Sequence, residues 1–102
     1  VLIAGRNGAA LLARLDGKDA AALLTAAQQN PHDVEAQLAA ADVELMGGRT
    51  ADAFNRIIQV VRTTHDEERE AARTRLLELF AMVGQSDPDV AAARRSLAAA
   101  LF

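Results

Sequence analysis

The sequence predicts an all-α fold of about six antiparallel helices, arranged as three helix pairs. Alanine, the residue with the highest helix propensity, makes up about a quarter of the 102 residues. β-Branched residues are sparse outside the segment 57–61, so no long segment favours strands. Short turn signals separate the apolar segments, and these are Asp16-Gly17, Asn30-Pro31, Gly47-Gly48, 64–66 and Asp87-Pro88.

The first predicted pair covers residues 1–30. Because the chain begins at Val1 inside an apparent helix (1–15), we expect it to be a fragment of a longer polypeptide. Asp16 is expected to cap the second helix, since an aspartate before a helix accepts hydrogen bonds from its first backbone N–H groups. This helix is expected to end near residue 29, because the residue before Pro31 disfavours the α conformation.

The second pair covers residues 31–65 and has the clearest pattern. Its first helix, about 33–46, stops at two glycines, and a glycine there can adopt the left-handed conformation that closes a helix. Thr50 is expected to be the N-cap of the next helix, which runs to about residue 63. That helix is apolar on most sides, so we expect it at the centre of the core. Its apolar residues are Ala53, Phe54, Ile57, Ile58, Val60 and Val61.

The third pair covers residues 66–102. Thr64 and Glu67 have the spacing of a capping box before the fifth helix. Asp87 and Pro88 are typical of an N-cap and a first helical position in the sixth. Three acid–base pairs are expected on the exposed face of the fifth helix, each contributing a few tenths of a kcal/mol: Asp66–Arg69, Glu70–Arg73 and Arg75–Glu78. Its apolar stripe is Ala72, Leu76, Leu79, Phe80 and Val83.

The segment Asn30–His65 has the length and small-residue spacing of one tetratricopeptide repeat, a helix–turn–helix unit of about 34 residues. Ala41 allows close approach of the second helix, and Gly48 closes the turn. The aromatic residues usual near the start and end of the first helix are replaced by Gln37 and Glu44. Such a unit cannot bury its apolar face alone, which predicts a right-handed superhelix of stacked repeats in one domain over 1–102.

Composition excludes several classes of function. The formal net charge of −3 gives no basic footprint for nucleic acid or an anionic membrane surface. No apolar segment approaches the roughly 20 residues that span a bilayer. The chain has no cysteine, and the sequence shows no nucleophile–base pair, phosphate-binding loop or metal-ligand spacing. We therefore expect no enzyme activity and no cofactor. The arginine and alanine bias favours a bacterial source, and we expect a cytoplasmic location.

The concave face of the superhelix is the candidate binding site. It is formed by the first helix of each pair and takes Glu35, Leu38 and Asp42 from the second pair. Thr74 and Glu78 are the corresponding residues of the third. Carboxylates in such a concavity can bind basic or backbone N–H groups of a partner protein. The alternative is a solvated face that binds nothing.

Other candidates also have plainer alternatives. Arg94 and Arg95 can bind an acidic partner, or interact with solvent and the C-terminal end of their helix. Leu101 and Phe102 can fill a pocket of a partner, or seal the fifth helix within the chain. Both histidines lie at predicted turns, far apart in the sequence, and lack the neighbours that a metal or general-base role requires.

The tail from Leu76 to Phe102 carries a family resemblance. It reads LLELFAMVGQSDPDVAAARRSLAAALF and resembles the C-terminal end of thioredoxin–tetratricopeptide fusion proteins of the YbbN or CnoX type, called chaperedoxins. The segments N-P-x-D-x-E-A at 30–36 and G-R-x-x-x-A-F at 48–54 are similar to that family as well. The resemblance implies an upstream thioredoxin-fold domain in the full-length chain. It also implies that the helical part binds other proteins, including unfolded clients or a chaperonin.

A second hypothesis belongs to a different class of function. The domain is then structural and forms a homo-oligomer, because terminal helices of a repeat stack expose apolar faces that have no neighbour.

Overall fold

The described part of this computed structural model, residues 11–101, consists of helices joined by short turns and contains no strand. The predicted all-α class is therefore confirmed. Residues 11–15 form the helical segment that precedes α2, and residues 1–10 of the predicted first helix lie outside the described residues. The helices are α2 (Ala20–Gln29), α3 (Val34–Met46), α4 (Thr50–Thr63), α5 (Asp66–Val83) and α6 (Pro88–Leu101).

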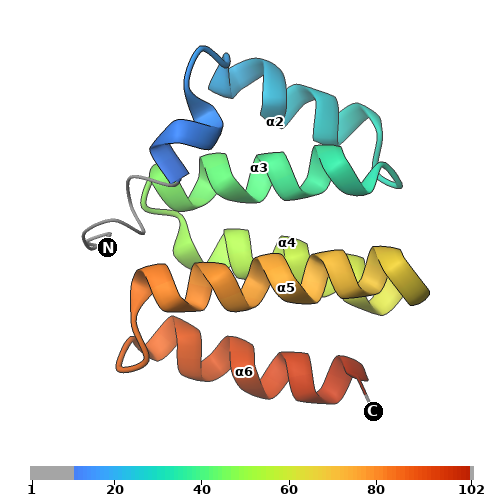
Figure 1. The fold of residues 1–102 in the computed structure, drawn as a ribbon, viewed down its shortest axis with the longest axis vertical. Coiled ribbons are helices and arrows are strands. Elements are labelled where there is room, and N and C mark those ends of the chain that lie inside the picture. The colour runs from blue at the N-terminus through green and yellow to red at the C-terminus, as the bar shows by residue number, and fades with distance from the viewer. Residues whose placement is uncertain (1–10, 102) are drawn as a thin grey trace.

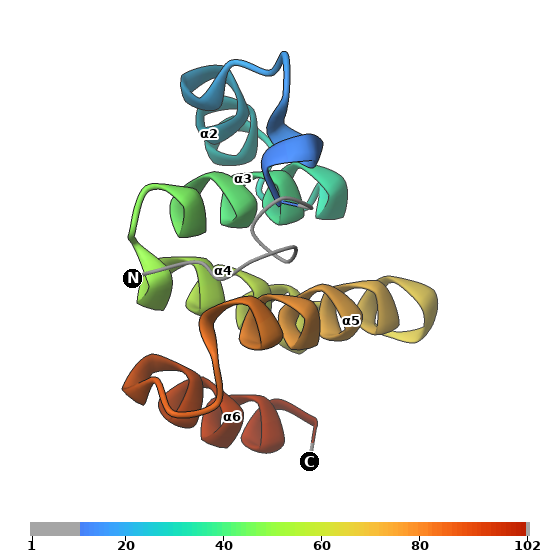
Figure 2. The same cartoon turned by 60° about the vertical axis from the view of Figure 1, so that its left-hand side comes forward.

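The helices stack as antiparallel neighbours into the predicted right-handed superhelix. Figure 1 shows α2, α3, α5 and α6 from top to bottom, with α4 partly behind α5. The turned view in Figure 2 keeps the same order of layers. In both views α3 and α5, the first helices of two successive pairs, run in the same direction. Side chains of these two helices therefore meet on one face of the molecule.

The core is centred on α4, as predicted from its apolar residues. This helix contacts α3, α5 and α6, and Phe54, Ile57 and Ile58 are each at most 2% exposed. The ring of Phe54 meets the ring of Phe80 edge to face, with centroids 5.0 Å apart and planes at 90°. Such a pair contributes about 1 kcal/mol beyond the area that it buries. It joins the second helix pair to the third.

The cap of α2 differs from the predicted one. Asp19, not Asp16, is the N-cap residue, and its Oδ1 accepts a hydrogen bond from the Ala22 N–H at 3.2 Å. Asp16 lies in the turn before it, where Gly17 has a φ of +72°. That turn places two further residues before the helix, so the capping geometry is first available at residue 19.

This difference gives a direct test of the α2 boundary. The variant Asp19→Ala is expected to lower the free energy of unfolding by about 1 kcal/mol, the usual effect of removing a side-chain cap. Asp16→Ala, the matched control, is expected to change it by less than about 0.5 kcal/mol. Urea unfolding followed by circular dichroism measures both. A larger loss for Asp16→Ala would show that the cap lies at residue 16.

The start of α4 also differs from the prediction. Arg49 is the N-cap residue, and Thr50 is the first residue of the helix. The Thr50 hydroxyl is buried and has no hydrogen-bond partner among residues 11–101. Gly48, with a φ of +81°, still closes α3 as predicted, because a non-glycine residue is strained in that conformation.

The start of α5 is not a capping box. His65 is the N-cap residue and makes no side-chain cap hydrogen bond, while the Thr64 hydroxyl donates to the carbonyl of Val60 at 2.7 Å. Asp66 has a left-handed φ of +56°, which breaks the continuous helical turn that a capping box needs after Thr64. The predicted Asp66–Arg69 pair does not form. Arg69 donates instead to the Thr64 carbonyl, at 3.1 Å.

The predicted start of α6 is confirmed. Pro88 is the first helical residue, where its missing N–H costs no hydrogen bond. The Oδ1 atom of Asp87 accepts from the Asp89 N–H at 2.8 Å. Leu101 is partly buried and packs against the core, which agrees with the sealing role, and Phe102 lies outside the described residues.

Candidate functional site

A groove of about 540 Å³ lies between α3 and α5 on the face that the sequence predicted to bind. It combines apolar surface from Leu38 and Ala71 with five charged side chains, four of which are glutamates. The residues that line it are Glu35, Leu38, Glu67, Glu70, Ala71, Thr74, Arg75 and Glu78.

Four of the five predicted site residues line this groove, and the fifth lies beside it. Glu35 and Thr74 are exposed, and Glu78 is partly exposed. Leu38 is only 4% exposed, so it belongs to the core as well as to the groove. Asp42 is 2% exposed and does not line the groove. Its carboxylate instead forms ion pairs with Arg14 and Arg75 of the same chain. A role of the five predicted residues in binding remains a prediction.

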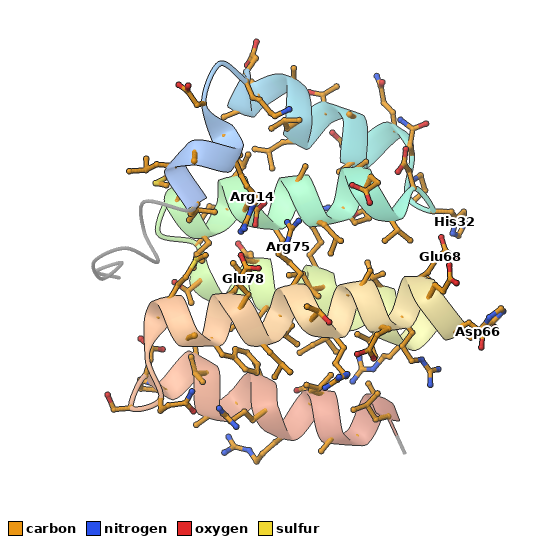
Figure 3. The ribbon with its side chains drawn as sticks, viewed as in Figure 1. Arg14, His32, Asp66, Glu68, Arg75 and Glu78 are labelled. Atoms are coloured by element: carbon orange, nitrogen blue, oxygen red, sulfur yellow. The ribbon has the colours of Figure 1, made fainter. Side chains whose placement is uncertain are left out.

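Asp42 belongs to a charge cluster that ties three helical segments together. Figure 3 shows Arg14, Arg75 and Glu78 gathered between α3 and α5. The Arg14 Nε lies 3.1 Å from an Asp42 oxygen, and the Arg75 Nη1 lies 2.7 Å from the same oxygen. Arg14 also pairs with Glu78. Burial of Arg14 by itself lowers its pKa, but the hydrogen bonds that Arg14 donates to Asp42 and Glu78, together with the attraction of the two negative charges, raise the pKa above its ordinary value.

The cluster replaces one of the ion pairs predicted along α5. Of those pairs, Glu70–Arg73 forms, with Arg73 Nη2 2.6 Å from Glu70 Oε1. Arg75 pairs with Asp42 and not with Glu78, because a carboxylate that is withdrawn from water interacts more strongly with a cation than an exposed one does. Sequence reasoning missed this role of Arg75. The signal in the sequence is that Asp42 directly follows three alanines at 39–41. A carboxylate in such an apolar segment needs a cation, but the segment does not indicate which one.

At the other end of the groove, two of the three carboxylates have no cationic partner among the described residues. Glu35 and Glu67 are exposed residues in the first turns of α3 and α5. Neither carboxylate makes a hydrogen bond or ion pair with another residue of the described range 11–101. Glu70 accepts from Arg73, and that hydrogen bond lowers the pKa of Glu70.

Sequence reasoning also missed Glu67, Glu70 and Ala71 as groove residues. They lie seven, four and three residues before Thr74, which places them on the same face of one helix. Extending that helical spacing backwards from Thr74 is the signal that finds them.

A second polar cluster lies on the opposite side of α3. Gln37 and Glu44, which replace the usual aromatic residues, are 7% and 4% exposed. Arg56 of α4 donates to both, at 2.7 Å to Gln37 Oε1 and 2.7 Å to Glu44 Oε1. The Gln37 amide donates in turn to the carbonyls of Ala27 and Asn30 at the end of α2. Hydrogen bonds thus join α2, α3 and α4 where aromatic packing is usual.

The remaining candidates in the described range either contact other residues of this chain or lie outside any cluster that could hold a metal ion. The Arg94 guanidinium lies 5.5 Å from the centroid of the Phe80 ring and donates to Gln85. No group of three or more His, Cys, Asp or Glu side chains in the described range is placed to hold a metal ion. Within the same range, every helix is too short or too polar to cross a membrane.

Comparisons with known proteins find relatives that match part of the chain. The uncharacterised protein Rv1324 of Mycobacterium tuberculosis and the uncharacterised protein Mb1359 of Mycobacterium bovis are each 49% identical to it over 70 residues. That match covers 69% of this chain and 23% of each relative. The chain therefore spans about a quarter of the length of the curated relatives it matches. No solved structure shows significant similarity to it.

A family match covers nearly all of the described residues. The profile of the family described as "Tetratricopeptide repeat" matches residues 13–102, which include α2 to α6 and the charge cluster around Asp42. Domains of this type are interaction modules that bind other proteins through the surfaces of stacked helix pairs. The chain belongs to the tetratricopeptide repeat family.

Proposed function

We propose that this chain is a protein-binding module that holds a segment of a partner protein in the groove between α3 and α5. The observation that carries the proposal is the groove itself, because it places apolar surface and exposed carboxylates on the face built by the first helices of two successive pairs. Interfaces of this kind combine an apolar centre with a polar rim. The family membership supports protein binding in general.

We further propose that the module acts next to a thioredoxin-fold domain of the same polypeptide, in a chaperone-like role in the bacterial cytoplasm. Unfolded client proteins or a chaperonin are then the partners. The resemblance of the tail 76–102 to thioredoxin–tetratricopeptide fusions supports this context. The mycobacterial relatives agree with it in one respect, since more than three quarters of each relative lies outside the match.

Blocking the groove tests client binding. The chain in molar excess is expected to suppress the aggregation of thermally unfolding malate dehydrogenase, measured by light scattering. Ala71→Arg places a long cation in the groove and is expected to reduce this suppression several-fold, because Ala71 is an exposed lining residue. Ala51→Arg is the matched control, since Ala51 is an exposed helical alanine of α4 away from the groove.

Two outcomes would contradict the proposal. If neither the wild-type chain nor the control suppresses aggregation at excess, the client-binding role is wrong. If Ala71→Arg suppresses aggregation as well as the wild-type chain does, clients bind elsewhere on the molecule.

The structural alternative, self-association, is favoured by a different observation. Three large apolar side chains are exposed in the described range, Leu12 at 59%, Leu77 at 39% and Met46 at 38%. Association through such side chains buries apolar surface and raises the mass with concentration. Multi-angle light scattering over a wide concentration range separates the two functions, because a constant monomer mass would contradict self-association.

A further inference from the structure

We propose that the groove between α3 and α5 selects partner segments that carry a basic side chain, and that Glu35 and Glu67 hold this side chain between them. The inference rests on the proposed function of the groove and adds the chemistry of its partner.

The charges of the groove favour a cation. Its lining includes four glutamates and one arginine, and the arginine, Arg75, is already paired with the buried Asp42. An adjoining hollow shares Glu35, Glu67 and Ala71 with the groove and adds further carboxylates from Asp33 and Glu68. The negative potential therefore continues along the surface at this end and attracts basic segments during encounter.

Arg14 of this chain shows how the face formed by α3 and α5 holds a guanidinium group. It lies against one carboxylate from each helix, Asp42 of α3 and Glu78 of α5. Glu35 lies seven residues before Asp42, which is about two helical turns, and Glu67 lies eleven before Glu78, which is about three. The same face therefore presents a second pair of carboxylates, one from each parallel helix. Among residues 11–101 no cation is paired with either of them.

Apolar surface lies between the two carboxylate pairs. Leu38, Ala71 and Thr74 belong to the groove lining, and the first two are apolar. The aliphatic stem of an arginine or lysine can pack on such surface while its charged head reaches a carboxylate. A neighbouring apolar side chain of the partner would bury further area there. An acidic segment would instead bring like charges together, which opposes binding.

The test compares three fluorescently labelled peptides that have the same length and the same leucines. They carry arginine, glutamine or glutamate at two fixed positions, and fluorescence polarisation measures their binding to the 102-residue chain. The arginine peptide is expected to bind roughly tenfold more tightly than the glutamine peptide, and the glutamate peptide most weakly. Raising the salt concentration is expected to reduce the preference, since exposed charges are screened.

A pair of matched double variants locates the effect. E35Q/E67Q removes the two first-turn carboxylates of the groove and is expected to abolish the preference for arginine. D52N/D89N is the control, because these carboxylates lie in the first turns of α4 and α6 and do not line the groove. It changes the net charge by the same amount, and the exposed Arg49–Asp52 ion pair that it breaks involves no residue of the groove lining. This control is expected to retain the preference.

The groove variant from the client assay separates the two levels of the proposal. If the wild-type chain binds the three peptides equally and Ala71→Arg binds none of them, the charge preference is wrong and binding in the groove still holds. Equal loss of preference in both double variants would also overturn it, because net charge would then be the cause. Binding of no peptide by the wild-type chain would overturn the inference, while the aggregation assay still decides the proposed function. In the supporting case, amide NMR shifts of Ala71 and Thr74 move on addition of the arginine peptide.

Discussion

Replacing Asp42 with asparagine is expected to lower the free energy of unfolding by about 3 kcal/mol, because it removes the buried carboxylate that Arg14 and Arg75 share and leaves Arg75 without an acidic partner among the described residues. The side chain of Asp42 is 3% exposed, and it is the shared partner of Arg14 and Arg75. Asparagine has a similar shape, so the variant removes charge without opening a cavity. Urea unfolding followed by circular dichroism measures the loss.

Glu78→Gln is the matched control for Asp42→Asn. It also removes one carboxylate that pairs with Arg14, but the side chain of Glu78 is 41% exposed. An ion pair at that exposure contributes at most about 1 kcal/mol. Equal losses for the two variants would contradict the central role of Asp42. They would show that the ion pairs of this cluster contribute independently of burial.

The second large effect is expected at Arg56, which is the main counter-charge of the buried Glu44. Among the described residues, Arg56→Leu leaves Glu44 with one cation, the exposed Arg49 at 3.6 Å. It also leaves the Gln37 Oε1 without its donor. We expect a loss of about 3 kcal/mol in the free energy of unfolding. Arg49→Leu is the control and is expected to cost less than about 1 kcal/mol, because the Arg49 side chain is 57% exposed.

A double variant distinguishes lost charge compensation from lost packing at this position. In E44L/R56L the buried carboxylate is removed together with its partner, and leucine supplies apolar volume. Replacement of a buried ion pair by apolar residues is often neutral or stabilising, so the double variant is expected to lose less stability than Arg56→Leu. Its remaining loss comes from Gln37 Oε1, which still lacks its donor. A loss as large as that of Arg56→Leu would contradict this explanation and assign the effect to packing around Arg56.

The helical elements of the fold could be predicted from the sequence to within a few residues, and the reasons are local. The Asn30-Pro31 and Gly47-Gly48 stops act through the backbone of the residues themselves, and α4 begins and ends near the predicted positions. The predicted N-caps were less accurate. Asp16 and Asp19 both have the residue type of a cap, and the conformation of the turn at Gly17 decides between them.

The groove could be predicted in part. Glu35 and Thr74 are on the predicted face because helical spacing fixes the direction of a side chain relative to its own helix. The ion pair between Asp42 and Arg75 could not be predicted from helical spacing. Their contact joins positions 33 residues apart in the sequence, and no local pattern shows which of several carboxylates an arginine side chain will reach.

The sequence by itself determined the helices, their turns and the pairing of neighbours, because propensity, glycine, proline and helical period act within a few residues. It also determined that the repeat Asn30–His65 lacks the usual aromatic residues at 37 and 44. Only the tertiary structure decided what replaces them, a hydrogen-bonded cluster centred on Arg56. It also decided which carboxylates of the concave face are neutralised by Arg14 and Arg75 and which remain exposed. The physical reason is that the interaction of a charge depends on its burial and on its nearest opposite charge, and both are set when distant helices meet.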